Sequence, residues 1–104
     1  MTKQNYHYPI DLSWNHQEIK DVINFFTVVE DVYEQGVDYE NVLMSYKTFK
    51  NVVPSKSEER QISRDFEEVS GYSIYRVVTS AKELKQQFLE IKTPIKKSKK
   101  RLKL

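Results

Sequence analysis

The sequence predicts an all-α protein: a compact bundle of four amphipathic helices with an extended N-terminal arm and a disordered, basic C-terminal tail. Two observations lead to this fold class. Apolar residues recur at the three- and four-residue spacing of a helix face through most of the 104-residue chain. The chain also has only two glycines and three prolines, too little turn-forming material for a many-stranded sheet. We therefore expect an arm at residues 1–14, a helical bundle domain at 15–92 and a flexible tail at 93–104.

The first helix is expected over about residues 15–35. In the arm before it, aromatic and aliphatic residues alternate with polar ones across residues 6–12, which predicts an extended segment packed on the bundle. Asn15 followed by Glu18 has the spacing of a capping box, in which each residue satisfies a free backbone N–H group at the helix start. Gly36 supplies the left-handed residue that commonly follows the end of a helix.

Three further helices follow, joined by short connections. Each begins after a side chain that accepts a hydrogen bond from the first helical turn, a role suited to Asp38, Ser55 and Ser73. Their ends are marked by Pro54, Gly71 and the Thr93-Pro94 pair, because proline and a left-handed glycine interrupt a helix. Short connections between amphipathic helices favour antiparallel neighbours in a compact bundle.

The first helix is apolar around nearly its whole circumference. Its main stripe faces one way, and Phe25, Val28 and Val32 project from the opposite side. One interpretation places this helix at the centre of the bundle, with the N-terminal arm covering the second face. The other interpretation makes the second face a homodimer interface, because exposed apolar patches mark contact surfaces. The sequence leaves both interpretations open.

The net charge of +2 hides two regions of opposite sign. The tail holds six of the 17 basic residues, which leaves 11 basic against 15 acidic side chains, a net charge of −4, in residues 1–95. The body is therefore mildly acidic and the tail strongly basic. Clustered cations bind phosphate-rich polymers, so we expect polyanion contacts at Lys96, Lys97, Lys99, Lys100, Arg101 and Lys103.

Several classes of site are not expected. The chain has no cysteine, which excludes disulfides, thiolate metal sites and cysteine nucleophiles. His7 and His16 have no recognisable metal-ligand spacing, and no glycine-rich phosphate loop is present. We expect no catalytic residue, no cofactor and no metal. The sequence also lacks a signal peptide and any apolar run near the roughly 20 residues that span a bilayer, so a cytoplasmic location is the default expectation.

Three segments give the chain a resemblance to a known family. They are Tyr8-Pro9 with Trp14, the segment FKNVVPSKSEE at residues 49–59, and the segment SGYSIY at residues 70–75. Together they resemble uncharacterised protein family 0223, a group of short bacterial proteins, and the resemblance covers about residues 6–84. It implies a small all-helical fold and no particular activity. The basic tail lies outside it, so the resemblance implies nothing about the tail.

The segments around the second, third and fourth helices hold the best candidates for binding a partner. Basic and aromatic side chains gather there, and aromatic residues contribute much of the energy of protein interfaces. The expected interaction surface consists of Tyr46, Lys50, Lys56, Arg60, Tyr72 and Tyr75. A purely structural interpretation competes with it, because charged helix faces often only meet solvent. Arg64 also has the spacing to pair with Glu68 along the helix.

Three classes of function remain. The first, which we favour, is a small non-enzymatic protein-interaction module. The second is an accessory nucleic-acid or ribosome-associated protein, which would bind weakly and without sequence preference through the tail. The third is an enzyme, which no motif in the sequence supports.

Overall fold

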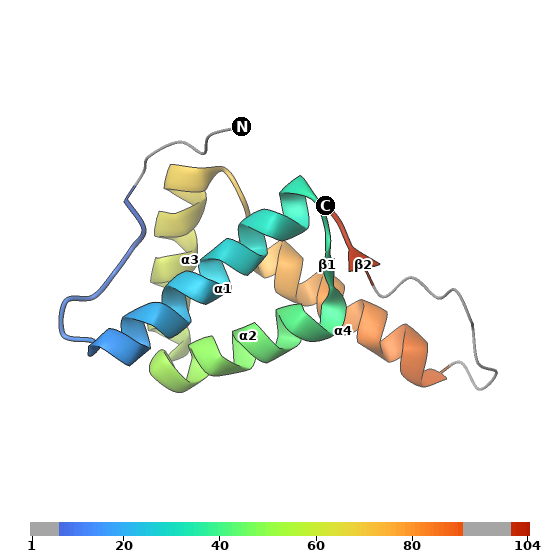
Figure 1. Cartoon of the computed structure of the whole chain (residues 1–104), viewed down its shortest axis with the longest axis horizontal. Coiled ribbons are helices and arrows are strands. Elements are labelled where there is room, and N and C mark those ends of the chain that lie inside the picture. The colour runs from blue at the N-terminus through green and yellow to red at the C-terminus, as the bar shows by residue number, and fades with distance from the viewer. Residues whose placement is uncertain (1–6, 91–100) are drawn as a thin grey trace.

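Four helices form nearly all of the regular structure in the computed structural model, which describes residues 7–90 and 101–104 (Figure 1). In chain order the elements are α1 (His16–Glu34), β1 (Val37–Asp38), α2 (Tyr39–Val52), α3 (Lys56–Ser70), α4 (Ile74–Glu90) and β2 (Arg101–Leu102). The predicted all-α fold is confirmed, and each helix begins directly after the residue predicted to cap it. The expected end of the fourth helix, the first six residues of the arm and residues 93–100 of the tail lie outside the described residues.

Side-chain hydrogen bonds define the helix starts. Asn15 Oδ1 accepts from the Glu18 backbone N–H at 2.8 Å, and Glu18 Oε1 accepts from the Asn15 backbone N–H at 2.9 Å. The predicted capping box is therefore complete. Asp38, Ser55 and Ser73 accept in the same way from backbone N–H groups in the first turns of α2, α3 and α4.

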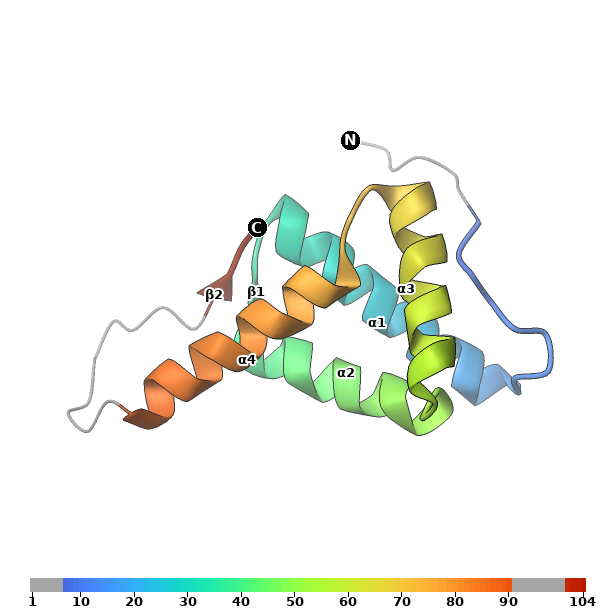
Figure 2. The same cartoon turned by 180° about the vertical axis from the view of Figure 1, so that it is seen from behind.

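The core is built where α1 and α2 pack along each other and α4 packs against α2 (Figures 1 and 2). α3 runs steeply across one end of this layer. Stacked phenylalanine rings join the helices: Phe25 lies 4.8 Å from Phe49 of α2, and Phe26 lies 4.7 Å from Phe66 of α3, measured between ring centroids. All four rings are fully buried, so they link three helices through one continuous apolar contact.

The second apolar face of α1 is buried inside the protein. Phe25 and Val32 have no exposed surface, and Val28 packs against the same core. Tyr46 and Phe49 of α2 lie against the Phe25 ring. The predicted homodimer interface through Phe25, Val28 and Val32 is therefore wrong, because a fully buried side chain has no surface to offer a second copy. The interpretation that places α1 at the centre is the one the structure supports.

The described part of the N-terminal arm covers a different face of α1 from the one expected. The Tyr8 ring lies 5.2 Å from Phe26 and 6.2 Å from Phe66, between centroids, whereas α2 covers Phe25. The Tyr8 hydroxyl donates to the Glu30 carboxylate at 3.0 Å. Glu30 has no exposed surface, so this hydrogen bond helps to offset the cost of burying its carboxyl group.

The last four residues differ from the flexible tail that was expected there. β2 pairs antiparallel with β1, placing Leu102 opposite Val37, and the Leu104 N–H donates to the Val32 carbonyl at 3.1 Å. Leu102 and Leu104 alternate with basic residues, which gives residues 101–104 one apolar side that packs on the core. The high charge of the tail as a whole hid this short strand pattern.

Gly36 is required where the chain turns from α1 into β1. Its φ of +93° lies in the left-handed region that favours glycine. A Cβ at this position would lie 2.7 Å from Arg101 Nε. The Arg101 guanidinium crosses the glycine and donates to the Gln35 carbonyl at 2.9 Å, which supplies a charged donor to the C-terminal end of α1.

Candidate functional site

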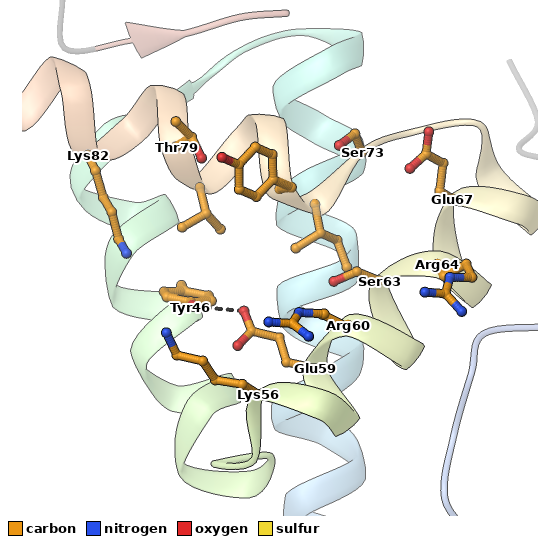
Figure 3. Close-up of a pocket in the computed structure, with 13 residues that line it drawn as sticks. Tyr46, Lys56, Glu59, Arg60, Ser63, Arg64, Glu67, Ser73, Thr79 and Lys82 are labelled. Atoms are coloured by element: carbon orange, nitrogen blue, oxygen red, sulfur yellow. Dashed lines mark hydrogen bonds between the residues drawn. The ribbon is translucent and has the colours of Figure 1, made fainter.

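A cleft of about 520 Å³ opens between α3 and α4 and reaches α2 (Figure 3). Ile74 and Val78 of α4 contribute buried apolar surface to it. Charged and polar groups from three helices make up the rest of the wall. The principal ones are Tyr46 of α2, Lys56, Glu59, Arg60 and Arg64 of α3, and Lys82 of α4.

Glu59 is held in the cleft by two donors. The Tyr46 hydroxyl donates to Glu59 Oε2 at 2.7 Å, and Lys50 Nζ donates to Glu59 Oε1 at 2.6 Å. The Glu59 and Lys50 side chains are only 19% and 24% exposed, so water screens this ion pair less than it screens a pair on the open surface. Lys82 Nζ lies 5.5 Å from the centroid of the Tyr46 ring, within cation–π range.

The surroundings of Tyr46 raise the pKa of its hydroxyl above the usual value. Burial is the largest cause, because it disfavours the charged phenolate. The hydrogen bond to Glu59 and the negative charge of that carboxylate raise the pKa further. Tyr46 therefore keeps its proton and serves as a donor to Glu59, which is the opposite of what a nucleophile or general base needs.

The cations on the α3 wall have no partner in the described part of the protein. Lys56, Arg60 and Arg64 are exposed, and none forms an ion pair or a side-chain hydrogen bond with another described residue. The Arg64–Glu68 pair suggested by the helical spacing is not formed. In Figure 3 the amine of Lys56 and the guanidinium of Arg60 lie beside the Tyr46–Glu59 contact, and the amine of Lys82 approaches it from α4. These groups leave unpaired positive charge at the opening.

Most of the predicted interaction surface gathers at this cleft. Lys50 does not line the cleft, but it forms an ion pair with Glu59, which does. Tyr72 does not join it, because its ring stacks on Tyr33 of α1 at 4.5 Å and its hydroxyl donates to Glu34 at 3.0 Å. The predicted residues that line the cleft are Tyr46, Lys56, Arg60 and Tyr75.

Sequence reasoning missed two members of the site. Lys82 comes from the fourth helix, and only the packing of α4 against α2 brings its amine over the Tyr46 ring. Glu59 stands in the sequence as one of two adjacent acids, and its bonds to Tyr46 and Lys50 cross the turn at Pro54. No helical spacing rule connects residues on two sides of a turn, so the sequence held no signal for either contact.

The opposite side of α3 carries the opposite charge. A smaller hollow of about 250 Å³ lies there, between α3 and the N-terminal arm. It is lined by Asp11, Glu58 and Asp65 around Trp14. The positive charge of the larger cleft is therefore a local feature of one side of the helix.

The predicted polyanion contacts stay largely untested. Lys96, Lys97, Lys99 and Lys100 lie outside the described residues. The Arg101 guanidinium already donates to the Gln35 carbonyl, and Lys103 is exposed. Within residues 7–90 and 101–104, no group of three or more metal-ligating side chains gathers, and no helix is long and apolar enough to cross a membrane.

Comparison with known sequences supports the resemblance noted above. Residues 5–90, which contain the whole cleft, match the uncharacterised protein family UPF0223. The UPF0223 protein of Streptococcus sanguinis (strain SK36) is 54% identical over 79 residues, which cover 76% of this chain and 86% of that protein. The UPF0223 protein of Streptococcus pneumoniae (strain CGSP14) is 57% identical over 83 residues, covering 80% and 89% respectively.

Proposed function

This chain belongs to the uncharacterised protein family UPF0223, and we propose that it is a small non-enzymatic protein-interaction module of the cytoplasm. Its partner binds in the cleft between α3 and α4. The proposal rests on groups suited to binding that the fold leaves free. Tyr75 is 75% exposed at this cleft, and Arg60 and Arg64, which also line it, have no partner among the described residues. Tyrosine and arginine are the residues most enriched, with tryptophan, among those that dominate binding energy at interfaces.

The chemistry of the cleft favours binding over catalysis. The residues that line it include no histidine and no cysteine. Ser73 already accepts a hydrogen bond as the cap of α4, and Tyr46 is held protonated against Glu59. A nucleophile needs a general base within hydrogen-bonding reach. It also needs hydrogen-bond donors placed to stabilise the negative charge that forms during the reaction. The residues that line the cleft assemble neither of these.

Site-specific photo-crosslinking tests this proposal in cells. A benzophenone-bearing amino acid replaces Tyr75 in one variant, and Lys85 in a control variant, in a Streptococcus host. Lys85 is exposed on the same helix but does not line the cleft. We expect a discrete protein crosslinked at position 75 and absent at position 85, identified by mass spectrometry.

Two results would contradict the proposal. One is the absence of any protein adduct at position 75 when the variant is folded and expressed at the wild-type level. The other is an identical set of adducts at both positions, which would mean that the crosslinker reports only random collisions. Crosslinks to RNA alone would favour the second class of function, a nucleic-acid-associated protein.

A further inference from the structure

We infer that the α3–α4 cleft recognises an acidic segment of a partner protein, one that presents several Asp or Glu side chains. This inference rests on the proposed function and specifies the chemistry of the partner. It follows from the charge of the cleft, from the geometry of its donors and from the contrast with the other side of α3.

The cleft concentrates positive charge in a body of negative charge. Its lining has four basic side chains, Lys56, Arg60, Arg64 and Lys82, against the two carboxylates of Glu59 and Glu67. Residues 1–95 as a whole carry a net charge of −4. An acidic segment is therefore attracted to this cleft and repelled by most of the surface around it. This charge pattern steers the segment toward the cleft as the two proteins approach.

The carboxylate inside the cleft does not cancel this charge. Glu59 is already neutralised by Lys50, which does not line the cleft, and it accepts a second hydrogen bond from Tyr46. Arg60 and Lys56 are consequently free to pair with groups from outside. A guanidinium presents two parallel N–H donors to a carboxylate, so Arg60 and Arg64 suit aspartate and glutamate side chains.

The size and lining of the cleft suit a short stretch of polypeptide. About 520 Å³ accommodates a few side chains, and Ile74, Tyr75 and Val78 offer apolar surface between the cations. The smaller hollow on the other side of α3, with Asp11, Glu58 and Asp65, repels the same segment. The two sides of α3 therefore discriminate by charge, and the acidic segment binds the α3–α4 cleft in preference to the smaller hollow.

Nucleic acid fits the cleft less well. Binding to a phosphate backbone requires cations along a track that follows several successive phosphates. Here the carboxylates of Glu59 and Glu67 interrupt the positive charge of the lining, and Figure 3 shows Glu59 between Lys56 and Arg60. The surrounding acidic body would face the rest of a nucleic-acid chain and repel it.

The test measures binding of a fluorescein-labelled peptide of alternating glutamate and alanine by fluorescence anisotropy. Every protein is full length and carries glutamine at Lys96, Lys97, Lys99 and Lys100, so that the tail does not compete for the peptide. The cleft variant is Arg60→Glu with Lys82→Glu. The matched control, Arg76→Glu with Lys85→Glu, makes the same change in net charge at two exposed residues of α4 that do not line the cleft. Circular dichroism establishes that all variants are folded.

We expect the cleft variant to raise the Kd for the glutamate peptide at least about tenfold, and the control to change it less than about twofold. The same peptide with glutamine in place of glutamate should not bind. Equal losses in the two variants, or binding of the glutamine peptide, would overturn the inference. So would tighter binding of a single-stranded DNA of the same length that depends on Arg60 and Lys82.

The peptide test and the crosslinking test distinguish a failure of this inference from a failure of the proposed function. A protein partner crosslinked at position 75, together with no binding of the glutamate peptide, leaves the interaction module in place and removes its preference for acidic partners. Peptide binding that depends on the cleft, without any crosslinked protein, supports the charge recognition and counts against the module as the cellular function.

Discussion

Among single residues, Glu59 shows how the cleft keeps cations available for a partner. An unpaired carboxylate at this position would attract the exposed cations beside it and close the hollow with internal ion pairs. Because Tyr46 and Lys50 already satisfy Glu59, Lys56 and Arg60 keep their charge for a partner. The network thus separates a structural ion pair, partly shielded from water, from binding groups at the surface.

The raised pKa of Tyr46 leads to a prediction about alkaline pH. Above about pH 10, the usual pKa of tyrosine, the unfolded chain loses the Tyr46 proton while the folded chain keeps it. The folded state then binds more protons, so this residue makes the free energy of unfolding fall as pH rises above about 10. We expect Tyr46 to titrate late in the ultraviolet absorbance of the folded protein.

Single substitutions identify that tyrosine. Tyr46→Phe should remove the late step and flatten the dependence of stability on pH in this range. Tyr75→Phe is the control and should leave the late step in place, because it does not change Tyr46 or its hydrogen bond to Glu59. A late step of unchanged amplitude in the Tyr46 variant would show that Tyr46 is not the tyrosine that titrates late.

At the level of helices and strands, the sequence predicted where helices begin and end better than it predicted how they pack together. Caps such as Asn15 and Ser55 act on backbone groups within one helical turn, so local sequence suffices to find them. Packing depends on residues distant in the chain. One interpretation had the arm covering the second apolar face of α1, but α2 covers Phe25 there. The same reason explains why Lys82 was missed in the cleft.

The capping box of α1 gives a prediction at this scale. Asn15→Ala removes the acceptor for the Glu18 N–H and should lower the free energy of unfolding by about 1 kcal/mol. Asn24→Ala is the matched control, because Asn24 is exposed within the same helix and makes no hydrogen bond through its side chain to any described residue. Urea unfolding followed by circular dichroism measures both. Equal midpoints for the two variants would mean that the box contributes nothing to stability.

Across the whole molecule, α1 is held from both ends of the chain. Tyr8 of the arm donates a hydrogen bond to Glu30 of α1. At the other end of the chain, the Leu104 N–H donates to the Val32 carbonyl of α1. A chain of this size buries a modest fraction of its surface, so such terminal contacts matter to its stability. Neither the described residues of the arm nor residues 101–104 line the α3–α4 cleft. The stabilising contacts at the termini and the proposed binding surface are therefore separate.

This separation yields a prediction for the C-terminal strand. Leu102 and Leu104 are partly buried against the core, so replacing both with alanine should lower the free energy of unfolding by about 1–3 kcal/mol. Lys103→Ala, a change at the exposed residue between them, should leave the urea midpoint unchanged. The double-alanine variant should not alter the Kd for the glutamate peptide while the protein stays folded. A double-alanine variant as stable as the wild type would show that β2 does not pair with β1 in solution. A loss of peptide binding in that folded variant would show instead that the C-terminal strand supports the cleft.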